Sequence, residues 1–321
     1  MDTLPDQLLE ARPDAGRAWH HVAARPAGAL MALPGLKWLQ PVSRCIGAVT
    51  REAGRVTVVS GPHGVTPRAG PLTVVSANLW HDWPRQQRWP ERLEAFAELV
   101  ASEDADVILL QEVARTSTLK ADVWLAERLG MSLVYARANG DLDAVGFEEG
   151  VAILSRYSIG DLQLRQLSQG RNPFVRRVAL GGHVDTPYGN LLVVSVHLGL
   201  VRRHNAGQIR RLRTWVRDVS QGEMAVIGGD FNASEDRREI EHTSRTWTDT
   251  FRATRPHDEA ATHTKSRPGR RILHRRLDYI FVQQSPTVRW NVLESLHLDA
   301  PSGPHSDHRA VLTRLLPVVI T

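Results

Sequence analysis

Cysteine is almost absent from this chain: Cys45 is the only one among 321 residues. A single thiol can form neither an internal disulfide framework nor a thiolate zinc site within one chain. A metal ion bound by this protein would therefore be held by oxygen and nitrogen ligands.

Long hydrophobic runs are absent as well. The apolar stretch over residues 27–39 is interrupted by a proline, a glycine and a lysine, so it is too short and too broken to span a bilayer. The first ten residues are acidic and lack the basic start and unbroken apolar core of a secretory signal. These absences predict a soluble, cytoplasmic protein.

Lysine is scarce, and arginine supplies most of the positive charge. Only Lys37, Lys120 and Lys265 are lysines among 40 basic residues, and the formal net charge is +5. A positive balance favours polyanionic partners such as nucleic acid, phosphorylated lipid or an anionic membrane surface. The arginine bias can equally reflect genome composition, so charge indicates a class of partner and no more. No protein partner can be read from the sequence.

The chain divides by composition near residue 70. Residues 1–70 are rich in Ala, Pro, Gly and Arg and contain only short periodic pieces, including a strand-like stretch at 55–60. We predict an N-terminal extension of unknown role over 1–70 and a single folded domain over 71–321. With 42% hydrophobic residues, a chain of this length can bury a large core.

The pattern from residue 71 onward predicts a mixed α+β fold. Apolar, β-rich runs predict strands near residues 72–79, 106–111, 150–155, 175–184, 190–197, 224–229, 277–282 and 309–316. Helical periodicity predicts helices over 86–102, 119–129, 206–219 and, more weakly, 235–241. Because some strands come in adjacent pairs and others alternate with helices, a sandwich is favoured over a simple doubly wound sheet.

The most informative segment is Met224–Ser234, an apolar strand that ends in two glycines followed by Asp230, Phe231 and Asn232. Side chains alternate along an extended chain, so Asp230 and Asn232 should point one way and Phe231 back into the core. A carboxylate beside an amide suits holding and deprotonating a water next to a phosphate. Asp and Asn are also common turn residues, and this segment alone does not separate the two interpretations.

Other predicted strands also start or end in residues suited to chemistry. They are Asn78, Glu112, His197, Asp278, Asp307 and His308. Glu112 follows so apolar a run that its charge is costly to bury without a compensating cation or donor, although a Glu just past a strand end can simply lie on the surface. A lone strand-end histidine is more often structural than catalytic. Taken together, the set favours one shared site.

The order of these residues resembles the endonuclease/exonuclease/phosphatase (DNase I-like) superfamily. The matching motifs are Asn78, Gln111-Glu112, His197, Gly229-Asp230-Phe231-Asn232, Asp278-Tyr279-Ile280 and Ser306-Asp307-His308, across about residues 71–316. His197-Leu198-Gly199 looks like the generic bacterial metal-dependent hydrolase branch. The resemblance implies a four-layer α/β/β/α sandwich, a catalytic domain over 71–321 and hydrolysis of phosphoester bonds.

The resemblance also implies a metal site. It assigns Glu112 as the main ligand, Asn78 beside it and Asp307 as a further ligand. The ion expected at such an oxygen-rich site is Mg²⁺, with Mn²⁺ as a possible substitute.

Five further residues receive catalytic roles by the same resemblance. Asp230 would orient and deprotonate the attacking water, and Asn232 would donate a hydrogen bond to a phosphate oxygen. His308 would contact the scissile phosphate from the opposite side, with Asp278 holding its ring. His197 fits a second phosphate-binding position.

The substrate is less well indicated. Arginines in the predicted helix 206–219 are typical of a solvated face, whereas those over 266–276 lead into the site and could hold phosphates of nucleic acid, an inositol phosphate or a phospholipid head group. Trp80, Trp83 and Trp89 could line the substrate wall or simply pack in the core.

Three functional hypotheses follow. On charge alone we favour a Mg²⁺-dependent phosphodiesterase acting on DNA or RNA, that is, a nuclease. The alternative is a small-molecule or lipid phosphatase or phosphodiesterase of the inositol phosphate or sphingomyelin type on the same site. The third is a binding module that keeps the fold without turnover.

Overall fold

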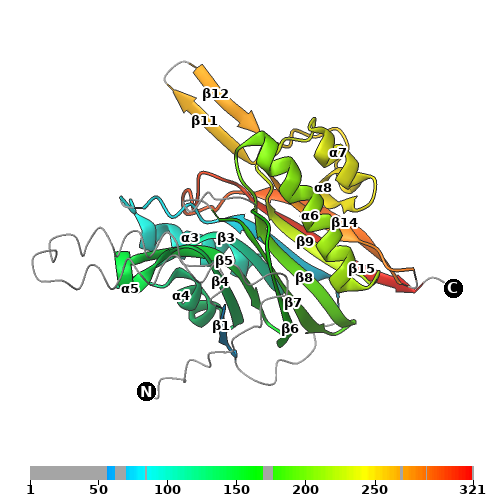
Figure 1. Ribbon diagram of the computed structural model, residues 1–321, viewed down its shortest axis with the longest axis horizontal. Helices are drawn as coiled ribbons and strands as arrows, with labels where there is room; N and C mark the ends of the chain where they lie inside the picture. The colour runs from blue at the N-terminus through cyan, green and yellow to red at the C-terminus, as the bar shows by residue number, and fades with distance from the viewer. Residues whose placement is uncertain are drawn as a thin grey trace, which may run out of the picture.

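The structure is a computed structural model that describes residues 56–61, 70–83, 85–168, 176–267, 270–286 and 288–319. Cys45 and most of the predicted extension lie outside these ranges. Two large β-sheets form the centre of the described chain (Figure 1).

The first sheet has seven strands, which come from both the N-terminal and the C-terminal parts of the described chain. Their order across the sheet is β1 (Val56–Val59), β4 (Ser132–Asp141), β5 (Phe147–Ser155), β3 (Val107–Thr116), β2 (Leu72–Asn78), β15 (Ala310–Val319) and β14 (Val288–Leu298). β2 and β3 run parallel, and the remaining neighbours are antiparallel.

The second sheet has six strands. Their order is β10 (Thr248–Asp249), β13 (Asp278–Gln283), β9 (Ala225–Asp230), β8 (Gly189–His197), β7 (Val178–Thr186) and β6 (Ile159–Gln166). A separate hairpin of β11 (His263–Arg267) and β12 (Arg270–Arg275) stands out from the sandwich next to the start of α6 (Arg202–Ser220) (Figure 1).

Helices cover the outer face of each sheet. α3 (Trp89–Ser102) and α4 (Ala121–Leu129) pack on the first sheet, and α6 and α7 (Arg238–Ser244) pack on the second. α5 (Leu142–Val145) and α8 (Thr250–Thr254) are short connectors. The arrangement confirms the predicted four-layer α/β/β/α sandwich.

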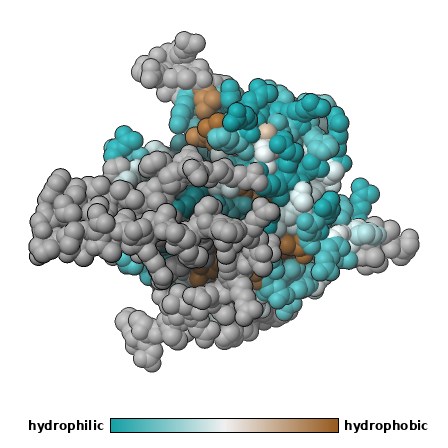
Figure 2. All heavy atoms as spheres, in the orientation of Figure 1, coloured by the Kyte–Doolittle hydropathy of each residue, from teal (hydrophilic) through white to brown (hydrophobic). Residues whose placement is uncertain are grey.

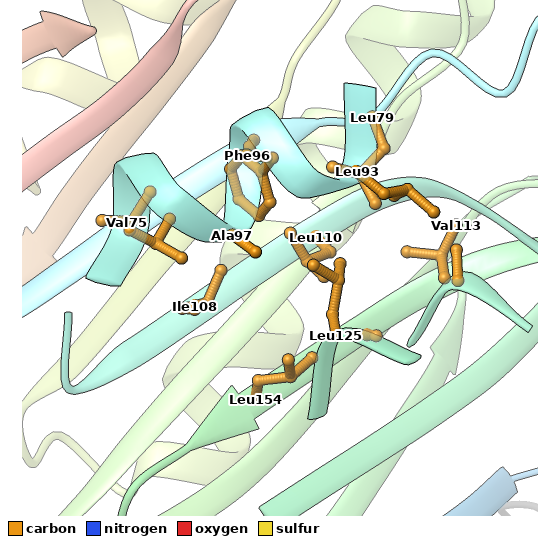
Figure 3. Packing of buried hydrophobic residues seen from close by; sticks show 14 of the residues in the cluster. Val75, Leu79, Leu93, Phe96, Ala97, Ile108, Leu110, Val113, Leu125 and Leu154 are labelled. Atoms are coloured by element: carbon orange, nitrogen blue, oxygen red, sulfur yellow. The ribbon is translucent and has the colours of Figure 1, made fainter. Parts of the chain in front are cut away.

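Three hydrophobic clusters fill the spaces between the four layers. Phe96, Ile108 and Leu125 belong to the cluster between the first sheet and its helices, which Figure 3 shows in detail. A second cluster lies between the sheets. The third packs α6 on the second sheet and includes Phe231, which is fully buried and therefore turns into the core as predicted.

The predicted element boundaries hold with local differences. α3 begins at Trp89 rather than at 86, because Pro90 favours the first helical turn while Gln86 and Arg88 have positive φ angles. α6 starts four residues earlier than predicted, and α7 lies three residues later. β4, β6, β14 and both strands of the hairpin were not predicted.

The strand-like stretch at 55–60 is part of the sandwich. Val56–Val59 forms β1 and pairs antiparallel with β4, so the first sheet includes residues that we assigned to the extension. The division at residue 70 otherwise stays a prediction.

The visible surface of the described residues is largely hydrophilic (Figure 2). Within those ranges, none of the helices combines the length and apolar character needed to cross a bilayer.

Candidate active site

Strand register brings three predicted site residues together on the second sheet. His197 ends β8 and lies opposite Asp230, the last residue of the parallel neighbour β9. Asp230 in turn lies opposite Asp278, the first residue of β13. Three titratable side chains therefore occupy adjacent positions at one edge of the sandwich.

The first sheet supplies Glu112 through a β-bulge. Pairing of β3 with β5 shifts between Leu110 and Val113, and Glu112 has φ 50°, in the left-handed region. We expected the strand to end at residue 111, but it continues to Thr116. Bulges re-aim side chains, and a non-glycine residue in the left-handed region costs about 1–2 kcal/mol. The fold thus keeps a strained residue where the metal ligand was predicted.

Asn78 links the two sheets. Its Nδ2 lies 3.2 Å from Glu112 Oε1 and 3.1 Å from Asp230 Oδ2, while its Oδ1 accepts a hydrogen bond from the Trp80 amide at 2.9 Å. The bond to the Trp80 amide fixes which end of the side chain is oxygen. In this arrangement Asn78 donates to two carboxylates.

The side chains of Asp230 and Asn232 lie together as predicted, but a turn rather than an extended strand brings them together. The strand ends at Asp230, and Asn232 follows in a left-handed turn with φ 48°. The backbone amide of Asn232 donates to Asp230 Oδ1 at 2.8 Å. The side-chain Nδ2 of Asn232 lies 2.9 Å from the Leu198 carbonyl and 3.3 Å from Asp230 Oδ2. Asp230 and Asn232 therefore form a turn, and this turn keeps their side chains together, as the site interpretation requires.

The surroundings of Asp230 raise the proton affinity of its carboxylate. Burial and the neighbouring charge of Asp278 raise the pKa of Asp230 to about 7. A carboxylate with a pKa near neutrality is suited to accept a proton from a water.

His308 and Asp278 form a hydrogen-bonded pair. His308 Nδ1 lies 2.7 Å from Asp278 Oδ2, and the Thr262 hydroxyl donates to the same oxygen at 2.6 Å. Burial opposes the imidazolium, but the charge and hydrogen bond of Asp278 raise the pKa of His308 to about 10. A cationic ring therefore lies close to the basic carboxylate of Asp230.

His197 has the opposite character. Burial and the charge of Arg177 lower the pKa of His197 well below its ordinary value. Arg177 Nη1 lies 3.1 Å from His197 Nδ1, and a guanidinium can only donate. The proton of the neutral ring is therefore on Nε2, which lies 3.5 Å from Asp230 Oδ2. Asn232 Nδ2 lies 3.3 Å from Nε2 and gives its hydrogens to the Leu198 carbonyl and Asp230 instead. His197 is a neutral donor, and Arg177 brings the positive charge on this side.

A pair that the sequence did not reveal lies beyond Glu112. His81 Nε2 is 3.3 Å from Glu149 Oε2 and 3.7 Å from Glu112 Oε2. Although burial opposes it, the hydrogen bond from His81 and the charge of Arg177 lower the pKa of Glu149 to about 2. Burial raises the pKa of Glu112 despite the nearby imidazole of His81.

Asp307 is held near the site by His263. His263 Nδ1 lies 3.0 Å from the Asp307 carbonyl oxygen, and the rings of His263 and His308 lie 4.3 Å apart. The charge of Asp307 also contributes to the raised pKa of Glu112.

Two compact groups of possible metal-binding side chains occur in the described residues: Asp230 with Asp278 and His308, and His263 with Asp307 and His308. Neither of these groups of acidic and imidazole side chains contains Glu112. In the first group, His308 and Asp278 already bind each other through a hydrogen bond, which explains why their side chains lie together. Glu112, by contrast, is a carboxylate whose burial disfavours its charge, which fits a hard cation such as Mg²⁺.

The three tryptophans after Asn78 have different environments. Trp89 is buried in the core, and Trp80 lies under the Arg92 guanidinium at 4.7 Å. Trp83 is 46% exposed and stacks on Phe147 at 4.7 Å. Of the three, Trp83 is the one left free to contact a ligand.

Five residues at the site were missed by sequence reasoning: His81, Glu149, Arg177, Thr262 and His263. His81 stands three residues after Asn78 in a strand-end loop, so extending the strand-end rule by a few residues would have found it. Glu149 lies within a strand and carries no comparable signal.

Sequence comparison shows a relative that covers part of the chain. The uncharacterized protein YbhP of Escherichia coli (strain K12) is 30% identical over 155 residues, which are 44% of this chain and 58% of that relative. The chain thus spans less than two thirds of the curated relative that it matches.

Solved structures share the fold over most of their length. An endonuclease/exonuclease/phosphatase family protein from Leptotrichia buccalis C-1013-b aligns with TM-score 0.64 at 19% identity, covering 76% of this chain and 99% of that one. A mannosyl-6-phosphatase from Bacteroides thetaiotaomicron VPI-5482 aligns with TM-score 0.57 at 20% identity, covering 76% and 99%.

The family match covers most of the chain. Residues 75–308 match the Endonuclease/Exonuclease/phosphatase family, and this range runs from β2 through to His308. The chain therefore belongs to the Endonuclease/Exonuclease/phosphatase family.

Proposed function

We propose that this protein is a Mg²⁺-dependent phosphoesterase that hydrolyses a phosphodiester bond. One observation carries the proposal: the near-neutral carboxylate of Asp230 lies close to the imidazolium of His308, which Asp278 holds. A base for water and a cation for phosphoryl oxygens are the two groups that phosphoester hydrolysis requires of the protein.

The residues around the water would act as follows. Asp230 accepts the proton of the attacking water as its oxygen forms a bond to phosphorus and the ester oxygen departs. Asn232 and His197 donate hydrogen bonds on the same side, and Arg177 adds positive charge behind His197. His308 neutralises charge on a phosphoryl oxygen.

Glu112, with Asp307 nearby, would hold Mg²⁺, or Mn²⁺ in its place. When bound, such an ion supplies positive charge to the phosphoryl and leaving-group oxygens. The oxygen of Asn78 is used by the Trp80 amide, so Asn78 supports Glu112 more directly than it would bind a cation.

By its net charge of +5 alone, the chain favours DNA or RNA as the substrate class. The mannosyl-6-phosphatase fold neighbour supports the alternative, a small-molecule or lipid phosphoester. A non-catalytic binding module is the least supported hypothesis, because a carboxylate and an imidazolium suited to hydrolysis lie close together at the candidate site. A cytoplasmic location stays a prediction.

Substitution of the base and the cation tests the chemistry. Asp230→Asn and His308→Ala should abolish Mg²⁺-dependent hydrolysis of bis(4-nitrophenyl) phosphate, plasmid, single-stranded DNA, RNA, inositol phosphates and sphingomyelin. Thermal unfolding should stay near that of the wild type. Asp218→Asn, an exposed change on α6, is the matched control and should leave hydrolysis intact. Turnover retained in either site variant would contradict the proposal.

The metal assignment has its own readout. Mg²⁺ should raise the melting temperature of the wild type more than that of Glu112→Gln, because only the wild type keeps the carboxylate ligand. Glu98→Gln, on the exposed side of α3, should behave as the wild type does. Equal shifts for the wild type and Glu112→Gln would remove Glu112 from the metal site.

A further inference from the structure

A cleft of about 980 Å³ opens next to Asn232. Its walls come from the start of α6, the loop after β9, the segment before β11 and the end of β12. In Figure 1 the projecting hairpin stands on one side of this region, next to α6 and the α7–α8 segment. Asn232 lines the cleft and also contacts Asp230, so the cleft adjoins the candidate site.

Most charged groups in the cleft are already paired. Arg276 binds Asp249 at 2.7 and 2.8 Å and Glu235 at 2.8 Å, and Arg252 binds Glu235 at 2.7 Å. Asp258 and Glu259 are also in ion pairs. The charges of these residues neutralise one another, so a ligand in the cleft would not need to pair with them.

Two arginines of the cleft are left over. Arg202 and Arg275 are exposed and make no ion pair with any described residue. Asp236 is the one acidic side chain lining the cleft that lacks a cationic partner among the described residues, and it accepts from the Ser234 hydroxyl at 2.5 Å. The unpaired charge of the cleft is therefore positive.

The start of α6 adds to this positive potential. The helix is 19 residues long, begins at Arg202, and has no side-chain hydrogen bond at its N-cap residue Val201. Uncapped amides and the helix dipole favour an anion near a helix N-terminus. Together with Arg202 and Arg275, they make the cleft suitable for an anionic group.

The size of the cleft limits what it can hold. A volume of this order matches pockets that bind small molecules, which range over roughly 300–1,000 Å³. A compact ligand that places its reacting phosphate at Asp230 would extend past Asn232 into this space.

We propose that the cleft binds the non-reacting part of a compact substrate, and that Arg202 and Arg275 recognise a second phosphate group in it. This inference rests on the proposed phosphoesterase function and names its substrate class: a small molecule with two phosphates, free or as a lipid head group.

Competition against bis(4-nitrophenyl) phosphate hydrolysis with Mg²⁺ in excess tests this assignment. We compare fructose monophosphate with fructose bisphosphate, phosphoglycerate with bisphosphoglycerate, and vesicles of phosphatidylinositol with vesicles of phosphatidylinositol monophosphate. The wild type should bind the doubly phosphorylated member of at least one pair about ten-fold or more tightly, since hydrogen bonds to charged groups are worth roughly 1.5–3 kcal/mol.

Substitution of the two arginines tests whether they cause this preference. Arg202→Gln combined with Arg275→Gln should remove it while leaving kcat for bis(4-nitrophenyl) phosphate unchanged. Arg203→Gln is the matched control, because it is exposed on the same turn of α6 and does not line the cleft. Success with a soluble pair or with vesicles identifies the source of the second phosphate.

Three results would overturn the inference: no preference in any pair, a preference that survives in the double variant, or an equal loss in Arg203→Gln. Tighter competition by a single-stranded oligonucleotide that ignores the two arginines would also overturn it, in favour of nucleic acid. Absence of hydrolysis in the wild type would instead refute the phosphoesterase proposal itself, so the two failures are distinguishable.

Discussion

His297 is an imidazole held in an apolar setting away from the catalytic edge. It stacks on Phe251 with ring centroids 4.0 Å apart, and neither ring nitrogen makes a hydrogen bond within the described residues. Burial, together with the charges of Arg276 and Arg309, lowers the pKa of His297 to about 3. The folded protein therefore keeps this ring neutral where the unfolded chain would protonate it.

This difference predicts an acid-sensitive contribution to stability. Below the unfolded pKa near 6.5 the unfolded chain takes up a proton that the folded protein refuses until about pH 3. Stability should thus be complete above pH 6.5 and fall on acidification, by up to about 1.4 kcal/mol per pH unit from this group. His297→Phe should flatten the pH dependence of the unfolding free energy between pH 6.5 and 4.

Urea unfolding of both proteins across that pH range provides the measurement. His183→Phe serves as the control, because His183 is only partly buried. The account fails if the wild type and His297→Phe lose stability in parallel as the pH falls.

The candidate site residues at strand ends could be predicted from the sequence, whereas the residues that contact them could not. Asn78, Glu112, His197, Asp230 and Asp278 follow or begin apolar runs, and the structure brings them together at one edge. Arg177 and Glu149 reach the same edge only because β7 and β5 pass beside it. Their proximity depends on tertiary packing that no local pattern records.

The bulge in β3 is the element on which the Glu112 assignment depends. Pairing on either side of it is regular, so the strain is confined to residues 111–112. The pattern of apolar residues predicted a strand here, but a one-residue insertion in the pairing leaves no mark in composition.

The bulge predicts an unusual order of stability for two substitutions. Glu112→Gly should be more stable than Glu112→Ala by about 1 kcal/mol, because glycine adopts φ 50° without the penalty that a Cβ imposes. Both variants should lose the effect of Mg²⁺ on the melting temperature. Thermal unfolding of the pair without metal measures the difference, and an alanine variant as stable as the glycine variant would show that the backbone there is unstrained.

Two of the strands missed from the sequence, β6 and β14, share a physical reason. β6 is largely half-exposed along its length, so its pattern lacks a hydrophobic face. β14 mixes buried and exposed positions and contains a register shift between Val292 and Glu294. The core strands β2, β3, β8 and β9 were predicted because they are buried on both faces and read as continuous apolar runs.

At the scale of the molecule, the two sheets approach closely near the site. Gly228 of β9 faces the first sheet, and a Cβ built there would lie 2.7 Å from Leu109 Cδ1 and 3.1 Å from Ser76 Cβ. Gln111 Nε2 also reaches the Ser195 hydroxyl across the gap at 3.2 Å. The spacing of the sheets is thus set a few residues from Asp230 and Glu112.

Gly228→Ala should therefore disturb stability and activity together. Overpacking between the sheets should cost roughly 1–3 kcal/mol, and kcat should fall because Asn78 can no longer reach both carboxylates. Gly160→Ala is the control, since a Cβ there meets nothing within 4 Å. Chemical denaturation and hydrolysis rates measure the two effects. Unchanged values for Gly228→Ala would show that the sheets can separate without consequence.

The hydrogen bonds of Asn78 also govern when the protein can become active during synthesis. One joins residues 34 positions apart and the other spans 152, while His308 follows all three of these residues in the sequence. Contacts of such sequence separation form late, after most of the chain is available. A chain that ends before His308 would hold only part of the proposed site, so hydrolysis should begin only after residue 308 has been synthesised and folded.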